Sequence, residues 1–523
     1  MNLDVASLSS ATRDVSAMLR TRRRSDILLF LAIFLVTLCL TPVIVLGAWS
    51  IGFSYVLAIF VALLFTLIII KWPVFGLFVI VACALVVEQD PISIGSLTLN
   101  VYVFYWPTRL QGLADRPIGV LFFFILLVLV CHNIVRRKKL LQGGKLFLPF
   151  LFLILCIAMG IVHGLTSGGD FRVIVLEIRS FEYLFLSYIL AYNLFTRFEH
   201  VRLFFWFVIF GAGVKGLQGT YVYLIVLHGN LDNVNQIMPH EDSFFFAALL
   251  LLIVLFVLHH AYRPQLIAAL AVSPFVLIAL VGNERRADYA ALLLGIGVAW
   301  LLLFLIKPQY RKRLAIILVV TLLLGGAYVL AFAHASGTIA KPAQSIISIF
   351  SPTVGSRDYF SNLYRSIEDF DLKFTIRQSP LIGWGFGKPF LQPLPLPNII
   401  TLDPYYLYIP HNTIYWVWMR MGAIGYGAFW FLIGSIIVRG CFVARQLRNP
   451  YLQLVAIFIV AIVFMEVAVA YADYQLYFYR NVIYLGLLVG MLLKLPSMDK
   501  EEKAPVHAST RRFTELPVAS GRS

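Results

Sequence analysis

His411 and Asn412 lie where a long polar segment of the chain gives way to an apolar one. An imidazole has an ordinary pKa of about 6.5, so at neutral pH it can remove a proton from a substrate hydroxyl. Asn412 can cap a helix that begins near Thr413, which would hold the imidazole in place. The pair therefore predicts a general base at His411. The alternative is a histidine that only anchors the start of a helix at the membrane surface.

Three arginines have the chemistry to bind an anion. Arg285 and Arg286 lie at the outer end of an apolar segment, against the trend that keeps basic residues on the cytoplasmic side. Arg365 lies on a predicted loop helix. A guanidinium presents a planar fork of donors that matches two phosphate oxygens. We predict that these side chains bind phosphate; for Arg286 and Arg365, contact with solvent or lipid headgroups is the alternative.

Arg179 lies inside an apolar segment, where a charge is costly unless it is paired. Glu177 and Glu182 are close to it in the sequence, which favours a structural ion pair, with a role near a lipid substrate as the alternative. Two further acids, Glu466 and Asp473, are seven residues apart and share a helix face. They are expected to pair with intramembrane cations, namely Arg179, Lys215 or Arg480.

Apolar residues dominate the chain. Of its 523 residues 60% are hydrophobic and 13% are charged, which is more apolar surface than a soluble domain can bury. The apolar runs are long enough for helices of about 20 residues to cross a bilayer, whereas a β-barrel would show alternating segments of about 10 residues. The sequence predicts an all-α polytopic integral membrane protein with about 14 transmembrane helices in the lipid bilayer. These spans start near Ile27, Ile51, Pro73, Pro117, Leu146, Val173, Leu203, Phe244, Gln265, Tyr289, Leu314, Thr413, Tyr451 and Asn481.

The basic residues predict the orientation of the spans. Lys and Arg are concentrated in loops that become cytoplasmic when both termini lie inside. The net charge of +16 is therefore mainly an orientation signal. Because the basic residues are scattered over short loops rather than gathered on one folded face, we expect no nucleic-acid partner.

The sequence divides into a cytoplasmic tail (1–25), spans 1–11 (26–335), a large outer loop (336–410), spans 12–14 (411–495) and a second cytoplasmic tail (496–523). A structureless loop of about 75 residues is improbable in a compact protein, so the outer loop should be ordered. Apolar residues recur every three or four positions from Arg357 to Arg377, which predicts a helix in which Arg365 and Asp369 can pair. Repeated prolines from Pro380 onward indicate a stiff, extended strap.

The sequence predicts no metal site and no cofactor. All five cysteines fall in spans or at cytoplasmic ends, so neither a disulfide nor a thiolate site is implied. Asp369 and Asp371 have the spacing of a metal-binding acid pair, but on a helix they point to different faces. The glycine turn at 383–387 offers a different, weaker possibility, since its backbone N–H groups could face a phosphate.

Four sequence features occur in an order and spacing that resemble the O-antigen ligase and O-antigen polymerase superfamily, and the likeness covers residues 281–425 and the many-span layout. They are Asn283-Glu284-Arg285-Arg286-Ala287 at a span end, Arg365 on the loop helix, the turn Pro380-x-x-Gly383-x-Gly385, and His411-Asn412 followed after nine residues by Gly422-x-x-Gly425. The last two glycines lie three apart on the helix predicted after His411 and are expected to let a neighbour approach it closely.

That family transfers glycans from polyprenyl diphosphate carriers in an inverting, metal-independent reaction. The resemblance implies that His411 activates the acceptor hydroxyl and that arginines, Arg286 more than Arg285, hold the diphosphate. It implies a bacterial plasma (inner) membrane, a polyprenyl diphosphate-linked glycan donor and a saccharide or protein hydroxyl as acceptor. Asn412 and Arg179 are further candidates for substrate binding. Tyr408 suits stacking on a sugar ring, although an interfacial tyrosine belt explains it equally well.

Two other functions fit a chain of this kind. A multi-span transporter or flippase of lipid-linked saccharide should concentrate its ionisable residues near the middle of the membrane. A transferase that uses polyprenyl monophosphate sugars resembles a class with acidic residues in the first outer loop, and the stretch from Gly47 to Gly52 has none. The candidate residues of this chain cluster instead at the outer boundary, which favours the glycosyltransferase.

Overall fold

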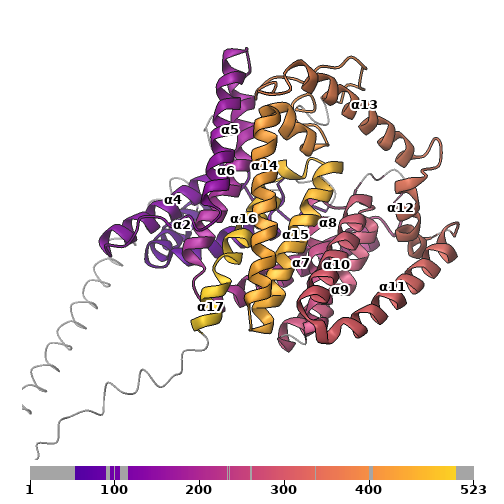
Figure 1. Cartoon of the computed structure of the whole chain (residues 1–523), viewed down its shortest axis with the longest axis horizontal. Coiled ribbons are helices and arrows are strands. Elements are labelled where there is room, and N and C mark those ends of the chain that lie inside the picture. Colours follow the sequence, from indigo (N-terminus) through magenta and orange to yellow (C-terminus); the bar gives the residue numbers. More distant parts are fainter. Residues whose placement is uncertain are drawn as a thin grey trace, which may run out of the picture. The chain divides into compact units, whose positions relative to one another are not determined.

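The computed structural model describes residues 53–89, 95–98, 101–105, 116–231, 234, 236–259, 262–335, 337–399 and 405–501. Within these ranges every regular element is a helix (Figure 1). The chain divides into two units, Met1–Trp72 and Pro73–Ser523, and the described part of the first unit is α2 (Phe53–Lys71). The second unit contains α3 (Pro73–Val86), α4 (Pro117–Val135), α5 (Phe147–Thr166), α6 (Phe171–Leu194), α7 (Phe198–Tyr221), α8 (His240–His259), α9 (Arg263–Gly282), α10 (Arg286–Ile306), α11 (Arg311–Phe332), α12 (Lys341–Phe350), α13 (Arg357–Gln378), α14 (Thr413–Gln446), α15 (Pro450–Ala472), α16 (Tyr479–Leu492) and α17 (Leu495–Glu501).

Ten helices in the described ranges are long and apolar enough to cross a membrane. Helices satisfy their own backbone hydrogen bonds, which a segment in lipid must do. The protein is therefore an all-α, multi-pass membrane protein, as the sequence predicts. Helices α2, α3 and α6 also coincide with predicted spans but are not among the ten. The tail at 1–25, the span predicted from Ile27 and residues 502–523 lie outside the described residues. The count of about 14 spans and their orientation therefore stay predictions.

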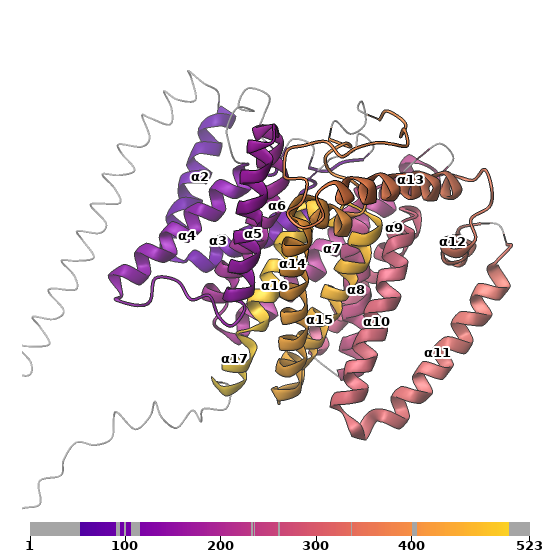
Figure 2. The same cartoon turned by 45° about the horizontal axis from the view of Figure 1, so that its top comes forward.

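Helix α15 is the centre of the second unit. It packs against α8, α10, α14 and α16, and its residues from Tyr451 to Val463 are buried (Figures 1 and 2). A helix that is apolar all round is stable only when other helices or lipid surround it. Asp473 directly follows α15 and is 2% exposed, so it lies in the middle of one end of the bundle.

The segment predicted as an ordered outer loop is helical in part. It contains α12 and α13, and α13 matches the predicted helix almost to the residue. Ser356 caps α13 by accepting a hydrogen bond from the backbone N–H of Tyr359 at 3.2 Å. Figure 2 shows α13 lying across the end of the bundle where α14 begins. The side chains on one face of α13 can therefore reach residues at the end of the membrane helices.

Helix α14 is broken at Gly422, where φ is 66° and ψ is −172°. The helix predicted to carry Gly422 and Gly425 is therefore interrupted at the first glycine, whereas the predicted close approach of a neighbour is confirmed there. The turn that begins at Pro380 fills the break, because the carbonyl of Pro380 accepts a hydrogen bond from the N–H of Ala423 at 2.8 Å. A Cβ atom on Gly422 would lie 2.2 Å from the carbonyl oxygen of Leu381. The two glycine motifs thus form one joint between the strap and α14.

Replacing Gly422 with alanine should destabilise the protein by about 3 kcal/mol, because a side chain is strained at this φ and would also collide with the strap. Thermal melting of the purified protein in detergent measures the effect. Gly427→Ala is the matched control on the same helix, since a Cβ there meets no atom within 4 Å. Equal melting temperatures for the two variants would contradict this account of the joint.

Arg420 fastens the strap to the membrane helices. Its side chain is fully buried and forms an ion pair of 2.5 Å with Glu177 of α6. It also donates hydrogen bonds to the carbonyl oxygens of Gly385 (2.8 Å), Lys388 (2.6 Å) and Tyr408 (2.8 Å). Hydrogen bonds from a buried guanidinium to carboxylate and carbonyl oxygens offset the free energy that its removal from water costs. Arg420 therefore holds the strap at Gly385 and Lys388 and again at Tyr408, three residues before His411.

The same contacts decide the possible role of the glycine turn. The N–H of Gly385 donates to the carbonyl of Arg420 at 3.2 Å, and the N–H of Gly387 donates to Glu177 at 2.6 Å. Both donors are used inside the protein. The possibility that this turn presents its N–H groups to a phosphate is therefore wrong for these two residues.

Candidate active site

His411 ends the strap two residues before α14, with 28% of its side chain exposed. Glu368 of α13 accepts a hydrogen bond from the backbone N–H of His411 at 3.0 Å, and its two carboxylate oxygens lie 3.2 and 3.3 Å from Nδ1. The rings of Tyr364 and Tyr474 meet the imidazole edge-on, with centroids 5.5 and 5.6 Å away. Among the described residues none forms a hydrogen bond with Nε2 of His411. The imidazole is thus bound to Glu368 through Nδ1, and its Nε2 is available for a hydrogen bond to another molecule.

Asn412 caps α14 as predicted. Its Oδ1 accepts the N–H of Tyr415 at 3.1 Å, and its Nδ2 donates to Asp369 of α13 at 3.1 Å. The predicted pairing of Asp369 with Arg365 is therefore replaced by a bond to Asn412, while Asp371 accepts the N–H of Leu394. Both ends of the Asn412 amide are engaged. In this arrangement Asn412 positions the chain beside His411, and its contact with substrate stays a prediction.

A cavity of about 760 Å³ lies among the start of α10, the end of α11, α12 and the start of α13. This volume is in the range of ligand-binding pockets. Five cationic side chains and two carboxylates line it, so its surroundings favour an anion. The charged residues are Arg285, Arg286, Lys341, Arg357 and Arg365 with Glu284 and Asp358; the hydroxyl residues are Ser345, Ser348, Ser351, Thr353, Ser356 and Ser361.

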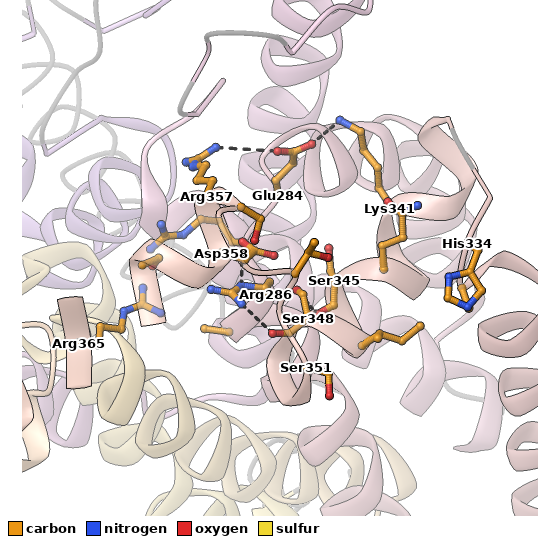
Figure 3. A pocket seen from close by; sticks show the side chains of 18 residues that line it. Glu284, Arg286, His334, Lys341, Ser345, Ser348, Ser351, Arg357, Asp358 and Arg365 are labelled. Carbon is orange, nitrogen blue, oxygen red and sulfur yellow. Dashed lines mark hydrogen bonds and ion pairs between the residues drawn. The ribbon is translucent and has the colours of Figure 1, made fainter. Parts of the chain in front are cut away.

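Arg365 is the cation of this cavity with the most available donors. It is half-buried, lines the cavity and forms no hydrogen bond with any described residue. Burial lowers the pKa of Arg365 from its ordinary value, and the negative charge of Asp473 opposes that effect. A guanidinium nevertheless stays protonated at physiological pH. Figure 3 places Arg365 at one end of the group of side chains that surround the cavity.

Arg286 lines the same cavity (Figure 3), and three of its nitrogen atoms already have partners. Nη1 donates to the carbonyl of Ser348 at 3.1 Å and Nη2 donates to Asn362 at 3.0 Å. Nε lies 3.3 Å from a carboxylate oxygen of Asp358. These contacts tie α12 and α13 to the start of α10. The sequence favoured Arg286 over Arg285 as the ligand of an anion. The geometry instead favours Arg365 over Arg286 for this role.

Arg285 forms an ion pair with the buried carboxylate of Asp473, and His240 lies 3.5 Å from the same carboxylate. The sequence predicted that Asp473 pairs with a cation inside the spans. Its partner is instead Arg285, which lies at the start of α10. Burial alone would raise the pKa of Asp473, but Arg285 and His240 hold it well below its ordinary value. The ion pair stabilises the folded protein fully above the pKa of about 3.9 that an aspartate has in the unfolded chain. This stabilisation is lost only as the pH falls through the lower pKa that Asp473 has in the folded protein. Asp473 is therefore ionised throughout the physiological range.

The cavity and the imidazole meet through α13. Arg365 lines the cavity, and Glu368 follows it by one helical turn, where residues three apart share a face. Glu368 in turn holds His411, which is not among the residues that line the cavity. The structure thus brings Arg285, Arg286 and Arg365 to one cavity, and His411 contacts α13 one helical turn after Arg365.

Two predicted residues lie elsewhere. Arg179 is 6% exposed, donates to the hydroxyl of Tyr479 at 3.4 Å and does not line the cavity. Glu177, one of its two predicted partners, pairs with Arg420 instead, and an ion pair with Glu182 stays a prediction. Tyr408 does not line the cavity either, and its carbonyl oxygen accepts a hydrogen bond from Arg420. This contact involves the main chain of Tyr408, so stacking of its ring on a sugar stays a prediction.

The remaining intramembrane cations form a paired network. Lys215 of α7 lies 2.7 Å from Glu88 and 3.2 Å from Asp242. Arg480 of α16 lies 2.7 Å from Asp242 and 3.0 Å from Glu241. The prediction that Glu466 or Asp473 counters these cations is therefore wrong. Because each of these side chains is at most 2% exposed and has an opposite charge beside it, the network serves the packing of α7, α8 and α16.

Sequence reasoning missed two important residues. Glu368 is the carboxylate that contacts His411, and its only signal is a position three residues after Arg365 on an amphipathic helix. Arg420 is a buried cation within an apolar stretch, which marks it as a residue that needs a partner. Comparison with known proteins adds no assignment: no protein-family model matches the chain, and no curated protein is significantly similar to it.

Proposed function

We propose that this protein is a membrane glycosyltransferase similar to the O-antigen ligase and polymerase superfamily. It moves a glycan from a polyprenyl diphosphate carrier to an acceptor hydroxyl at the outer face of a bacterial plasma membrane. One observation carries the proposal: the available guanidinium of Arg365 faces a cationic cavity one helical turn from the carboxylate that holds His411. This arrangement supports a proton acceptor close to an anion-binding site at one end of a bundle of membrane helices.

The chemistry follows from the roles of the two groups. Nε2 of His411 removes the proton of the acceptor hydroxyl while the oxygen attacks the anomeric carbon of the donor sugar. The bond between that carbon and the phosphate oxygen breaks, and the electron pair leaves with the polyprenyl diphosphate. Arg365, supported by the other cations of the cavity, stabilises the negative charge that develops on this leaving group. A single displacement of this kind inverts the anomeric configuration.

The exposed surface of α11 supports a lipid-linked donor. Leu322, Leu323 and Leu324 are 65%, 68% and 67% exposed, and Leu314 is the only buried residue of this helix. The end of α11 borders the cavity through Ala333 and His334. A carrier with an anionic head and a long apolar tail can therefore place its head in the cavity while its tail stays in the lipid.

A transporter or flippase of lipid-linked saccharide is the second candidate, because several charges are buried among the helices. These charges are paired with one another, as Lys215 is with Glu88 and Arg480 with Asp242. A transport pathway needs groups that bind and release a substrate near the middle of the membrane. The cationic cavity lies instead at the ends of α10, α11 and α13, which favours chemistry at the membrane surface.

The two candidates differ in whether the donor is cleaved. Purified protein in vesicles that contain undecaprenyl diphosphate-linked saccharide, together with a saccharide acceptor that has free hydroxyl groups, should release free undecaprenyl diphosphate, which is the product common to every acceptor. Release should continue in excess EDTA, since arginines stabilise the leaving group. Thin-layer chromatography of the radiolabelled lipid measures it. Intact lipid recovered in the opposite leaflet would instead identify a flippase, and loss of cleavage with EDTA would contradict the metal-independent mechanism.

A further inference from the structure

We propose that Glu368 is the positioning residue of His411: it fixes the imidazole as the tautomer that is protonated on Nδ1 and leaves Nε2 free to accept a proton. The catalytic meaning of this inference rests on the proposed function, but the tautomer itself does not. Glu368 does not line the cavity, and in the proposed reaction it does not touch the reacting atoms. It acts through the histidine.

The hydrogen-bond geometry leads to this tautomer. An ionised carboxylate can only accept hydrogen bonds. Glu368 already accepts the backbone N–H of His411 at 3.0 Å, and its oxygens lie 3.2 and 3.3 Å from Nδ1. Nδ1 must therefore carry the proton that points to Glu368, and Nε2 keeps its lone pair. In many sites the hydrogen bond made by one ring nitrogen sets the role of the other in this way.

Burial makes this contact strong. Glu368 is 1% exposed, so its carboxylate has lost most of its water and depends on protein donors. The neighbouring carboxylates are committed to other partners, since Asp473 pairs with Arg285 and Asp369 bonds to Asn412. Glu368 is thus the acidic side chain, among the described residues, that contacts the ring of His411.

The packing around the ring also limits its rotation. Turning the imidazole by half a turn would replace Nδ1 with a carbon atom in front of Glu368 and lose the hydrogen bond. The edge-on rings of Tyr364 and Tyr474 enclose the imidazole on other sides. Because Arg365 and Glu368 share one face of α13, the same helix positions the anion-binding guanidinium and the base. Catalytic groups must be held to within about 0.5 Å to be effective, which a rigid helix provides.

The tautomer can be measured without any substrate. The full-length protein, labelled with ¹⁵N-histidine and placed in lipid nanodiscs at about pH 8.5, contains neutral imidazoles whose ¹⁵N shifts separate protonated from unprotonated ring nitrogens. The resonances that disappear in His411→Ala belong to His411. We expect them to show a protonated Nδ1 and an unprotonated Nε2. In Glu368→Gln, whose amide lacks the negative charge, the second tautomer should appear.

The matched control is Asp369→Asn, which removes the adjacent carboxylate of α13 but leaves the contact with His411, and should leave the His411 resonances as in the wild type. Glu368→Asp provides a second variant in case Glu368→Gln does not fold, and it should retain the wild-type tautomer at least in part. A wild-type His411 protonated on Nε2, or the same spectrum with and without the Glu368 carboxylate, would overturn the inference.

Activity then separates this inference from the proposed function. Glu368→Gln should lower turnover by about 10–100-fold, a usual effect of removing a hydrogen bond that orients a functional histidine, with the donor KM unchanged. If the tautomer depends on Glu368 but no variant and no wild-type protein cleaves the donor, the proposed function is wrong and the positioning role stands. If cleavage occurs but the tautomer is independent of Glu368, the positioning role is wrong and the function stands.

Discussion

Replacing His411 with alanine should lower the turnover of donor cleavage by about 10²–10⁴-fold, the contribution that a positioned general base usually makes. The donor KM should change little, because His411 does not line the cationic cavity. Release of undecaprenyl diphosphate at saturating donor measures turnover, and its dependence on donor concentration gives KM. Both quantities are needed, since a loss confined to KM would make His411 a binding residue rather than the base.

A second histidine provides the control for this variant. His228 is exposed and has a positive φ of 50°, which asparagine also tolerates. His228→Asn should cleave the donor at the wild-type rate. If His411→Ala did the same, the imidazole would have no part in the reaction and the proposed mechanism would fail.

Loss of the Arg365 guanidinium should be the other large effect. Arg365→Ala should lower kcat/KM by about 10²–10³-fold, the range observed when one donor to a developing negative charge is removed. Arg365→Lys should recover part of the loss, because an ammonium group supplies the charge but not the planar fork. Steady-state donor cleavage measures both variants, and the melting temperature should stay near that of the wild type, because Arg365 forms no hydrogen bond with a described residue.

Arg286 gives the contrast that makes this result interpretable. Arg286→Ala removes bonds to Ser348, Asn362 and Asp358, so it should lower the melting temperature as well as activity. If Arg365→Ala were fully active and Arg286→Ala inactive but stable, the assignment of the anion ligand would have to be reversed. Measuring activity and melting on the same preparations distinguishes these cases.

Local patterns in the sequence predicted the elements of this fold well. The apolar runs predicted the membrane helices, and the spacing of apolar residues from Arg357 to Arg377 predicted α13. Asn412 predicted the start of α14 because a cap needs only the residues beside it. Each of these features is decided by neighbours a few positions away, so a single sequence contains the information.

Partners that are distant in the sequence could not be predicted. Glu368 meets His411 only because the strap between them folds back, and Lys215 meets Glu88 only because α7 packs beside α3. The break at Gly422 has the same origin, since a glycine tolerates both helical and left-handed backbone and the docking of Pro380 decides between them. The sequence could name the candidate cations, but only the tertiary structure assigns each a carboxylate.

Helix α11 has a practical consequence for anyone who purifies this protein. Its main neighbours among the described helices are α10 and α12, and Leu314 is its only buried residue, yet Ala333 and His334 beyond its C-terminal end form part of the cavity wall. Surrounding lipid must therefore supply most of the lateral pressure that keeps this wall in place. Extraction into small detergent micelles removes that support, whereas a nanodisc preserves it, so we expect the choice of amphiphile to decide whether the cationic cavity survives isolation.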